Sequence, residues 1–321
     1  MDARDPDLLA RVRGGLLDAD HVAPHTDADG LAAGALVLRA RGQGAGDALL
    51  LDRTQTPWGS DPDLPEGTVA LLDQGLRPFA RPGVIVDHHA PETGSDGAGP
   101  KVIALTSFGE RPEVPTAPLV CRALGTDAPA WLAALGAYGD LGADGLKLPE
   151  AGGTPRAAIA KLAPLVNAPR RLAGGPVRIA LALLVEAESP RDALADPRVA
   201  VLERARAEYR ATFDRVMRTA PRFFGDVAVV RFDVPYQVHP LVATAWMRRL
   251  APRPVLAAND GWVPGRVNFS VRGGDGRDLR ELLRAALPDA DGELGHGHPA
   301  ATGGSLPPAE FDRLLDGLAA A

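Results

Sequence analysis

The sequence predicts an α/β protein of two domains, in which a mostly parallel sheet flanked by helices is followed by a linker helix and a smaller α/β domain. The 321 residues exceed one small domain and suit two of ordinary size. Hydrophobic residues make up 45% of the chain and charged residues 24%, a balance that supplies sizeable cores and excludes wholesale disorder. Short apolar runs alternate with helical patterns in two separate regions, which is typical of parallel sheets covered by helices.

The first alternating region covers residues 19–105. It contains short apolar runs that we expect to be strands, at 20–24, 47–51, 68–72, 83–86 and 101–105. A helix is expected at 29–42, since apolar residues recur there on one face with helical spacing. Asp29 and Gly30 stand at its start, where an N-terminal cap is expected.

A mostly helical stretch follows. Its helix-like patterns are separated by proline and glycine, at 116–125, 129–139, 155–166 and 177–187. Cys121 is the one cysteine of the chain and lies among apolar residues of the first pattern, so we expect a buried structural thiol. A lone cysteine excludes a disulfide framework and a thiolate metal cluster, and it favours a reducing compartment.

Residues 198–222 form the longest unbroken helical pattern, with seven arginines against three acidic residues. We interpret this pattern as the connection between two domains, so that the chain divides into 1–190, a linker helix at 191–222, and 223–321. A solvated linker helix with mixed charges is the plainer interpretation. The functional interpretation is one wall of a cleft that attracts phosphates.

The second alternating region begins at Asp226. Strands are expected at 226–234, 253–260 and 265–273, helices at 239–251 and 278–287, and a glycine-rich loop at 292–306. These elements predict a compact α/β domain of about a hundred residues, within the usual range of domain sizes.

Charge is unevenly distributed along the chain. Residues 1–189 carry 17 basic and 24 acidic side chains, whereas residues 190–321 carry 18 and 17. The acidic N-terminal part does not exclude nucleic acid as a partner, because carboxylates that hold divalent cations are neutralised by them. No apolar run approaches the ~18 to 20 residues of a membrane span, so we expect a soluble, cytoplasmic protein without membrane association.

Acidic and imidazole side chains stand in four separated segments, three of them directly after expected strands. The residues are His25, Asp27 and Asp29, then Asp73, then Asp87, His88 and His89, and finally Asp140. Open parallel sheets carry ligand sites at the carboxyl ends of their strands, so we expect the three strand-end segments to open onto one crevice. Each segment alone has a plainer explanation as a cap or a turn, and the joint pattern favours a site.

The residue types in these segments fit a site for two hard divalent cations. Carboxylates with a few imidazoles and no sulfur suit Mn²⁺ or Mg²⁺, and Mn²⁺ is preferred because imidazole is a better ligand for it. Asp27 and Asp29 lie in a loop, so each can serve a different ion. Asp73, at the next strand end, is suited to bridge cations about 3.5 to 4 Å apart.

The order HTDADG, LLDQG, VDHHAP and GAYGDLG resembles the four motifs of the DHH phosphoesterase superfamily. The first motif is more similar to the RecJ-like and archaeal exonuclease branch than to the oligoribonuclease branch. In the second domain, NFSVRGG followed by GHGHPAATGG resembles the DHHA1 domain, although His296 stands where that family usually has glycine. The resemblance therefore implies a DHH domain, a linker helix and a DHHA1 domain, in a chain shorter than the larger bacterial RecJ nucleases.

The resemblance also implies roles for individual residues. The metal ligands correspond to His25, Asp27 and Asp73 for one ion, and to Asp29, Asp73, His88 and Asp140 for the other. Asp87 would orient an imidazole, and His89 would face the substrate phosphate. The two ions would activate a water that attacks phosphorus in line, so the catalytic candidates are His89, Asp87 and the bridging Asp73.

In the second domain the resemblance implies phosphate binding. Arg272 can hold a phosphate with two parallel hydrogen bonds, and Ser270 is a weaker candidate on the same expected strand. The backbone around Gly297 can line an anion site, with His296 and His298 beside it. From the residues alone, the favoured interpretation is a surface strand arginine for Arg272 and a loop histidine for His298.

Three functions are compatible with these residues. The first is a Mn²⁺-dependent phosphodiesterase or exonuclease acting on short single-stranded DNA or RNA, with Trp262 as a candidate platform for a base. The second keeps the chemistry and acts on cyclic dinucleotides, 3'-phosphoadenosine 5'-phosphate or polyphosphate. The third is an inactive scaffold, but relatives of that kind lose metal ligands and this chain has lost none. Assembly into a homodimer is left open.

Overall fold

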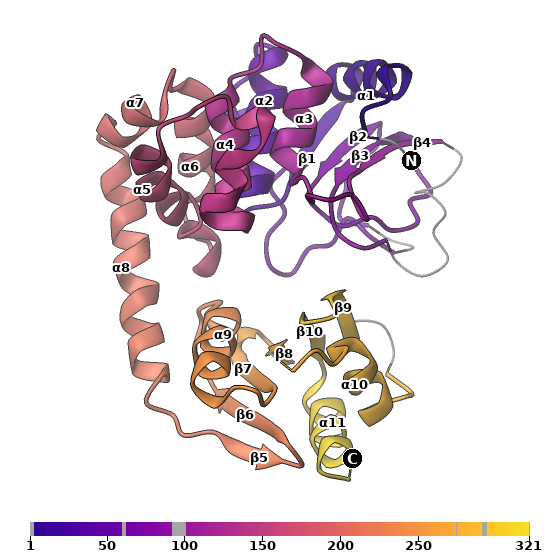
Figure 1. Ribbon diagram of the computed structural model, residues 1–321, viewed down its shortest axis with the longest axis vertical. Coiled ribbons are helices and arrows are strands. Elements are labelled where there is room, and N and C mark those ends of the chain that lie inside the picture. The colour runs from indigo at the N-terminus through magenta and orange to yellow at the C-terminus, as the bar shows by residue number, and fades with distance from the viewer. Residues whose placement is uncertain (1–2, 60–61, 92–100, 274, 291–293, 321) are drawn as a thin grey trace. The chain divides into compact units, whose positions relative to one another are not determined.

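The computed structural model describes residues 3–59, 62–91, 101–273, 275–290 and 294–320 (Figure 1). The chain folds into two compact units, Met1–Arg170 with Gly174–Arg206, and Arg171–Ala173 with Ala207–Ala321. One boundary falls inside helix α8 (Val199–Val216), in the part of the sequence interpreted as a linker. The α/β class is confirmed, with an all-parallel sheet in the first unit and a mixed sheet in the second. The division into 1–190, 191–222 and 223–321 stays a prediction.

Parallel strands form the sheet of the first unit, in the order β1 (His21–Pro24), β2 (Val69–Leu72), β3 (Gly83–Asp87) and β4 (Val102–Thr106). Leu72 is the register partner of both Pro24 and Val86, so the first three strands end at the same edge. The segments that follow these strands therefore start side by side, where parallel sheets carry their ligand sites.

Helices cover one face of this sheet. α1 (Pro6–Asp18), α2 (Ala28–Ala40) and α3 (Thr116–Leu124) pack there against apolar side chains of the strands. α2 is buried along most of its length, because its residues are small or apolar on every side. Irregular segments cover the opposite face and contribute Trp58, Leu64, Leu76 and Phe79.

The other helices of the first unit are α4 (Ala130–Leu141), α5 (Arg156–Val166), α6 (Val177–Glu186), α7 (Pro190–Ala195) and the start of α8. Cys121, on α3, is 8% exposed, so its predicted burial is confirmed. Burial and the nearby Glu150 raise the pKa of its thiol to about 11. Among the described helices, none combines the length and the apolar character that a bilayer crossing requires.

The strand expected at 47–51 is wrong. Ala45–Asp47 forms a short 3-10 helix, and beyond it a single bridge joins Ala48 to Val22 of β1. Arg178, on α6, donates to three carbonyl oxygens of this segment. A side chain thus satisfies backbone groups that a neighbouring strand would otherwise have to pair.

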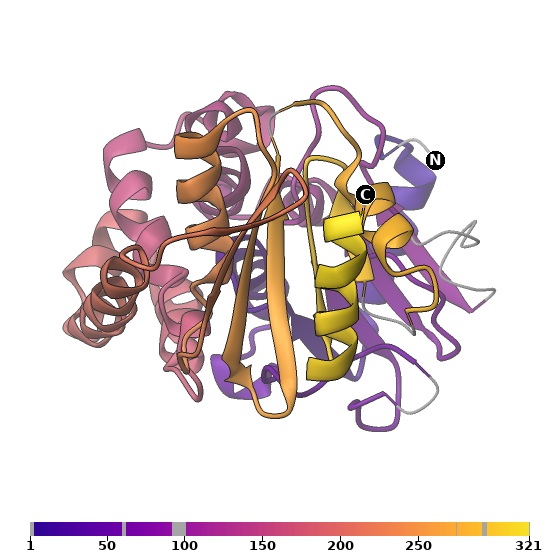
Figure 2. The same ribbon diagram turned by 90° about the horizontal axis from the view of Figure 1, so that it is seen from below.

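The second unit contains a mixed sheet in the order β5-β6-β7-β8-β10-β9. Its strands and helices are drawn in orange to yellow in Figure 2. Its strands are β5 (Arg222–Phe224), β6 (Val227–Phe232), β7 (Val255–Val263), β8 (Arg266–Arg272), β9 (Leu294–His298) and β10 (Ala301–Leu306). β6 and β7 pair in parallel, and the other neighbours are antiparallel. α10 (Leu279–Ala286) and α11 (Pro308–Ala320) share a core with the sheet, and α9 (His239–Leu250) packs against β7 and β8.

Two expectations for this unit are wrong. The helix expected to reach residue 222 ends at Val216, and β5 follows it and pairs with β6. The glycine-rich segment expected as a loop forms a hairpin of β9 and β10. A Cβ atom at Gly303 would lie 2.3 Å from the Phe269 carbonyl oxygen, so glycine here permits a close approach of β10 to β8.

Two helical glycines provide a matched test of the packing in the first unit. A Cβ atom at Gly34 of α2 would lie 2.9 Å from two side-chain atoms of Pro24, whereas one at Gly14 of α1 would meet no atom within 4 Å. We expect Gly34→Ala to lower the free energy of unfolding by about 1–3 kcal/mol through overpacking. Gly14→Ala should raise it by about 0.5–1 kcal/mol, because alanine is the better helix former. Urea unfolding measures both, and a stabilised Gly34→Ala chain would contradict the contact between α2 and β1.

Candidate metal centre

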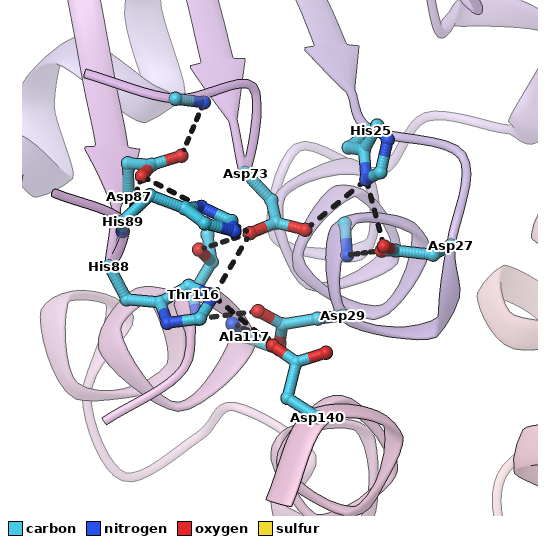
Figure 3. Close-up of polar contacts among 12 residues, drawn as sticks. His25, Asp27, Asp29, Asp73, Asp87, His88, His89, Thr116, Ala117 and Asp140 are labelled. Carbon is cyan, nitrogen blue, oxygen red and sulfur yellow. Dashed lines mark hydrogen bonds and ion pairs between the residues drawn. The ribbon is translucent and has the colours of Figure 1, made fainter. Parts of the chain in front are cut away.

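The segments that follow β1, β2 and β3 converge at one edge of the sheet, together with the end of α4 (Figure 3). The His25 amide donates to the Leu72 carbonyl at 2.8 Å, and the Asp73 amide donates to the Val86 carbonyl at 3.0 Å. These bonds extend the sheet by one residue and fix where two of the motifs begin. All of the acidic and imidazole residues predicted from the four motifs lie in this region.

Asp73 lies in the middle of the cluster. Its side chain is 2% exposed, and its backbone has a φ of 63°, the one positive value of a non-glycine residue in the described chain. Aspartate tolerates this left-handed conformation better than most residues. One carboxylate oxygen lies 3.5 Å from His25 Nδ1, and the other lies 3.5 Å from His88 Nε2. Thr116 Oγ1 donates to the second oxygen at 3.0 Å, so the carboxylate is held between two groups of side chains.

Three overlapping groups of side chains have donor atoms close enough to share an ion. They are His25, Asp27 and Asp73; Asp29, His88 and Asp140; and Asp73, His88 and His89. Within each group the ligand atoms lie within 4.8 Å of one another. Asp73 and His88 each belong to two groups, and Asp87 belongs to none of them. The individual ligand roles stay predictions, but the structure brings the residues together.

Asp29 connects two helices to this centre. Its carboxylate oxygens accept hydrogen bonds from the first two amides of α3, at 2.7 and 2.8 Å. A Cβ atom at Gly136 of α4 would lie 2.3 Å from Asp29 Oδ1, so glycine at this position lets α4 approach the carboxylate. One turn later, Asp140 Oδ2 reaches His88 Nε2 at 3.1 Å. Gly136 of the fourth motif thus serves the helix packing that places its aspartate.

The expected cap of α2 is wrong. Asp27 is the N-terminal cap, and its Oδ1 accepts a hydrogen bond from the Gly30 amide at 3.0 Å. Asp29 lies in the first turn of α2, and its carboxylate bonds to α3 instead. The sequence offers two aspartates in cap-like positions, and the contact with α3 decides between them.

Asp87 is fully buried and supports two neighbouring segments. Its Oδ1 accepts a hydrogen bond from the His89 amide at 2.7 Å and lies 3.1 Å from His89 Nδ1. Its Oδ2 accepts from the Gly75 amide at 2.6 Å. Burial would raise the pKa of Asp87, but the hydrogen bonds and charge of His89 outweigh it, and the pKa is lowered. An ionised Asp87 therefore orients the His89 ring and holds the turn after Asp73.

Further polar residues of the centre carry no signal in the sequence. They are Glu113, Thr116, Asn167 and Arg170, which lie 25 to 143 residues from their partners along the chain. Glu113 Oε1, for example, lies 2.7 Å from His88 Nδ1, the ring nitrogen opposite the one that faces Asp73. None of the four belongs to a recognisable motif, so spacing along the chain cannot identify them.

The buried carboxylates repel one another. Burial and the neighbouring carboxylates raise the pKa values of Asp29 and Asp73 well above the ordinary range. Burial would lower the pKa of His88, but Asp140 and Glu113 raise it to about 12. Asp29, Asp73 and His88 therefore hold protons more strongly than usual, and these protons reduce the net negative charge of the centre.

Asp27 behaves differently from Asp29 and Asp73. Burial would raise its pKa, but the charges of His25 and Arg170 hold that pKa well below the ordinary range. Its carboxylate is therefore ionised and already compensated by positive charge from the chain itself.

The donor set fits divalent cations. His25 Nδ1 and His88 Nε2 are buried. Carboxylate oxygens lie 2.9 to 3.5 Å from these two nitrogens, but not in the geometry of a hydrogen bond. Nitrogen and oxygen atoms that face one another in this way are arranged like ligands of a shared cation. Carboxylates with imidazoles and no thiolate suit Mn²⁺ or Mg²⁺, and Asp73 faces both groups as a bridging ligand would.

The residues predicted to bind substrate lie in the second unit. Ser270 and Arg272 lie on the same face of β8. The opposite face carries Val267, Phe269 and Val271, which belong to the core shared with α10 and α11. Arg272 Nη1 donates to the carbonyl oxygens of Val271 at 2.9 Å and Thr302 at 3.3 Å. Burial lowers the pKa of the guanidinium, and no carboxylate of the described residues pairs with it.

Other residues singled out in this unit are described in part. Gly297 belongs to β9, where it is the register partner of Thr302. The side chains of His296 and His298 lie outside the described part of the structure. Trp262, the candidate for base stacking, is 5% exposed on β7, so a base cannot stack on its ring in this conformation.

The chain is similar in fold to several solved structures. Exonuclease RecJ bound to manganese matches over 98% of this chain and 93% of that one, with a TM-score of 0.65 and 20% identity. RecJ from Thermus thermophilus in complex with Mn²⁺ has a TM-score of 0.67 and 21% identity, and this chain spans 55% of its length. A pGpG-specific phosphodiesterase from Vibrio cholerae matches over 94% and 97% of the two chains, with a TM-score of 0.52 and 14% identity. No family model and no curated protein sequence matches the chain.

Cation binding to this centre should release protons. The raised pKa values of Asp29, Asp73 and His88 mean that protons occupy groups that a cation needs as ligands. We expect Mn²⁺ affinity to rise with pH while these groups titrate, and to fall on acidification. Calorimetric titration in two buffers of different ionisation enthalpy counts the released protons. Binding without proton release would contradict the assigned ligands.

Proposed function

We propose, from the DHH phosphoesterase fold that the chain has, that it is a metal-dependent phosphoesterase that hydrolyses short single-stranded DNA or RNA. One observation carries the proposal: Asp73 faces two groups of carboxylate and imidazole side chains at the carboxyl edge of a parallel sheet. A carboxylate shared between two ligand groups is suited to two-metal phosphoryl chemistry. We further propose two divalent cations, with Mn²⁺ preferred over Mg²⁺ because both groups contain imidazole.

The chain's own residues supply positioning and charge for this reaction. Bound cations would polarise the phosphate and lower the pKa of a water molecule between them. Asp73 would set the spacing of the two groups, with one of its oxygens fixed by Thr116 at 3.0 Å. Asp87 would hold His89, whose side chain is 37% exposed, toward a substrate phosphate. Burial would lower the pKa of His89, but Asp87 and Asp73 raise it, so the ring keeps a proton to donate to a phosphoryl oxygen.

Binding of the rest of the substrate is assigned to the second unit. Arg272 is the principal candidate, because its guanidinium uses one nitrogen on backbone carbonyls and keeps other donors for a phosphate. Ser270 precedes it by two residues on the same face of β8 and is the second candidate. The backbone of Gly297, with His296 and His298 on either side of it, is proposed as an adjoining anion site.

A second substrate class is dinucleotides and related small phosphates. The specific support is the likeness to a pGpG-specific phosphodiesterase, which extends over nearly the whole of both chains. Cyclic dinucleotides, 3'-phosphoadenosine 5'-phosphate and polyphosphate would use the same cations and the same Arg272. The two substrate classes differ in whether further nucleotides must extend beyond the phosphate that is cleaved.

A substrate panel tests the proposal. With Mn²⁺, the purified chain should release mononucleotides from labelled DNA or RNA of about two to ten nucleotides, the scale of compact single-strand sites. Asp73→Asn keeps a residue that tolerates the left-handed backbone and removes the bridging charge. Its rate should fall by more than the ~10- to 100-fold typical of residues outside the ligand shell. Asp144→Asn, at an exposed ion pair with Lys147, is the matched control and should keep the native rate.

The panel also separates the two substrate classes. Cleavage of pGpG or cyclic dinucleotides without cleavage of longer oligonucleotides would favour the second class. Failure on DNA and RNA alike, with Mn²⁺ shown to be bound, would contradict the first. Native activity in Asp73→Asn would show that the assigned centre is wrong.

Arg272→Ala should weaken substrate binding more than it slows the chemical step. Loss of charge-assisted hydrogen bonds of about 1.5–3 kcal/mol corresponds to a KM raised by roughly 10- to 150-fold, with a smaller change in kcat. Arg272→Lys keeps the charge without the paired donors and should be intermediate. Steady-state kinetics separates the two parameters, and an unchanged KM would contradict the assignment. Thermal unfolding controls for the lost bonds to Val271 and Thr302.

A further inference from the structure

Arg170 places a fixed positive charge in one half of the metal centre. Its Nη1 donates to Asp27 Oδ2 at 2.9 Å, and its Nη2 lies 3.4 Å from His25 Nε2. The side chains of Arg170 and Asp27 are 20% and 17% exposed, so water screens the pair only in part. The guanidinium therefore balances a carboxylate that a cation would use.

The segment that carries Arg170 is anchored beside the centre. Asn167 Oδ1 accepts a hydrogen bond from the Ala28 amide at 2.9 Å, at the start of α2. Ala168 and Pro169 are buried, and Pro169–Arg171 forms a 3-10 helix. Arg170 is thus positioned by its own backbone, unlike a long surface side chain that reaches a carboxylate by chance.

The two halves of the centre differ in the positive charge they contain. In the first half, Asp27 Oδ1 accepts from an amide, and Oδ2 faces both Arg170 and His25 Nδ1. In the second half, formed by Asp29, His88 and Asp140, no arginine or lysine of the described residues contacts a ligand atom. A divalent cation therefore meets a carboxylate paired with an arginine in the first half, and carboxylates with no arginine or lysine partner among the described residues in the second.

We propose that Arg170 is an internal competitor of the divalent cation at the His25–Asp27–Asp73 position, which makes this position the weaker of the two and the second to fill. Its occupation requires Asp27 to exchange a guanidinium for the cation, and repulsion between the two positive charges opposes this exchange. The Asp29–His88–Asp140 position has no such competitor and fills first. The inference rests on the proposed metal-dependent function, and it concerns the order and strength of binding.

Titration calorimetry with MnCl₂ on the full metal-free chain tests the proposal. The native chain should bind two ions with unequal affinity. Arg170→Gln should strengthen the weaker ion by roughly 10- to 100-fold, the size of effect usual for residues that contact a metal ligand, and leave the tighter ion unchanged. Arg170→Lys keeps a positive charge and should keep most of the inequality. Arg39→Gln is the matched control, because Arg39 is 19% exposed in the same unit and bonds to the carbonyls of Val185 and Ala187.

The possible outcomes are separable. An unchanged or weakened second ion in Arg170→Gln would overturn the proposal, and the weakened result would make Arg170 a positioning residue for Asp27. Two equally tight ions in the native chain would overturn it as well, whereas no Mn²⁺ binding at all would overturn the proposed metal centre. The native chain offers a test without substitution: anomalous diffraction at limiting Mn²⁺ should locate an ion among Asp29, His88 and Asp140 first. An ion found first at His25 and Asp27 would contradict the proposed order.

Discussion

Repulsion among buried carboxylates at one edge of a parallel sheet is the constraint around which the first unit is organised. Burial raises the free energy of each ionised carboxylate, and repulsion from the neighbouring carboxylates raises it further. Each carboxylate has a different stabilising partner. Two amides of α3 donate to Asp29, the Arg170 guanidinium donates to Asp27, and the imidazole of His88 lies beside Asp140. Asp73, which has a hydroxyl and three imidazoles nearby, is left as the carboxylate with the most to gain from a cation.

The parallel strands of the first unit could be predicted from the sequence because buried parallel strands are continuous apolar runs. The run at 47–51 has the same composition, but Arg178, some 130 residues later, bonds to the carbonyl oxygens of Ala45, Gly46 and Ala48 at its start. The glycine-rich segment 294–306 shows the opposite error, because it is expected to be a loop and forms two strands. Glycine is common both in loops and where strands approach closely, and at Gly303 the second reason applies. In each case the deciding contact comes from a distant part of the chain.

Some residues of the candidate site could likewise be predicted from the sequence, and others could not. Residues that directly follow a strand, such as Asp73 and His88, could be placed together because the topology of a parallel sheet brings strand ends to one edge. Glu113 and Arg170 could not, since each depends on how a loop or a short helical turn packs. The two aspartates that begin α2 show the limit most clearly. Spacing allows either to cap the helix, and only the position of α3 assigns Asp27 to the cap and Asp29 to the neighbouring helix.

The contacts of Asp29 determine how a substrate complex of the proposed phosphoesterase can be captured for crystallography. Truncation of Asp29 would leave two amides at the start of α3 without acceptors and would open a void beside Gly136. A variant inactivated in that way would have a distorted site. The side chain of Asp140, by contrast, is 28% exposed at the end of α4 and lies close to one ring nitrogen, that of His88. Its amide isostere is the replacement that preserves the architecture around a trapped ligand.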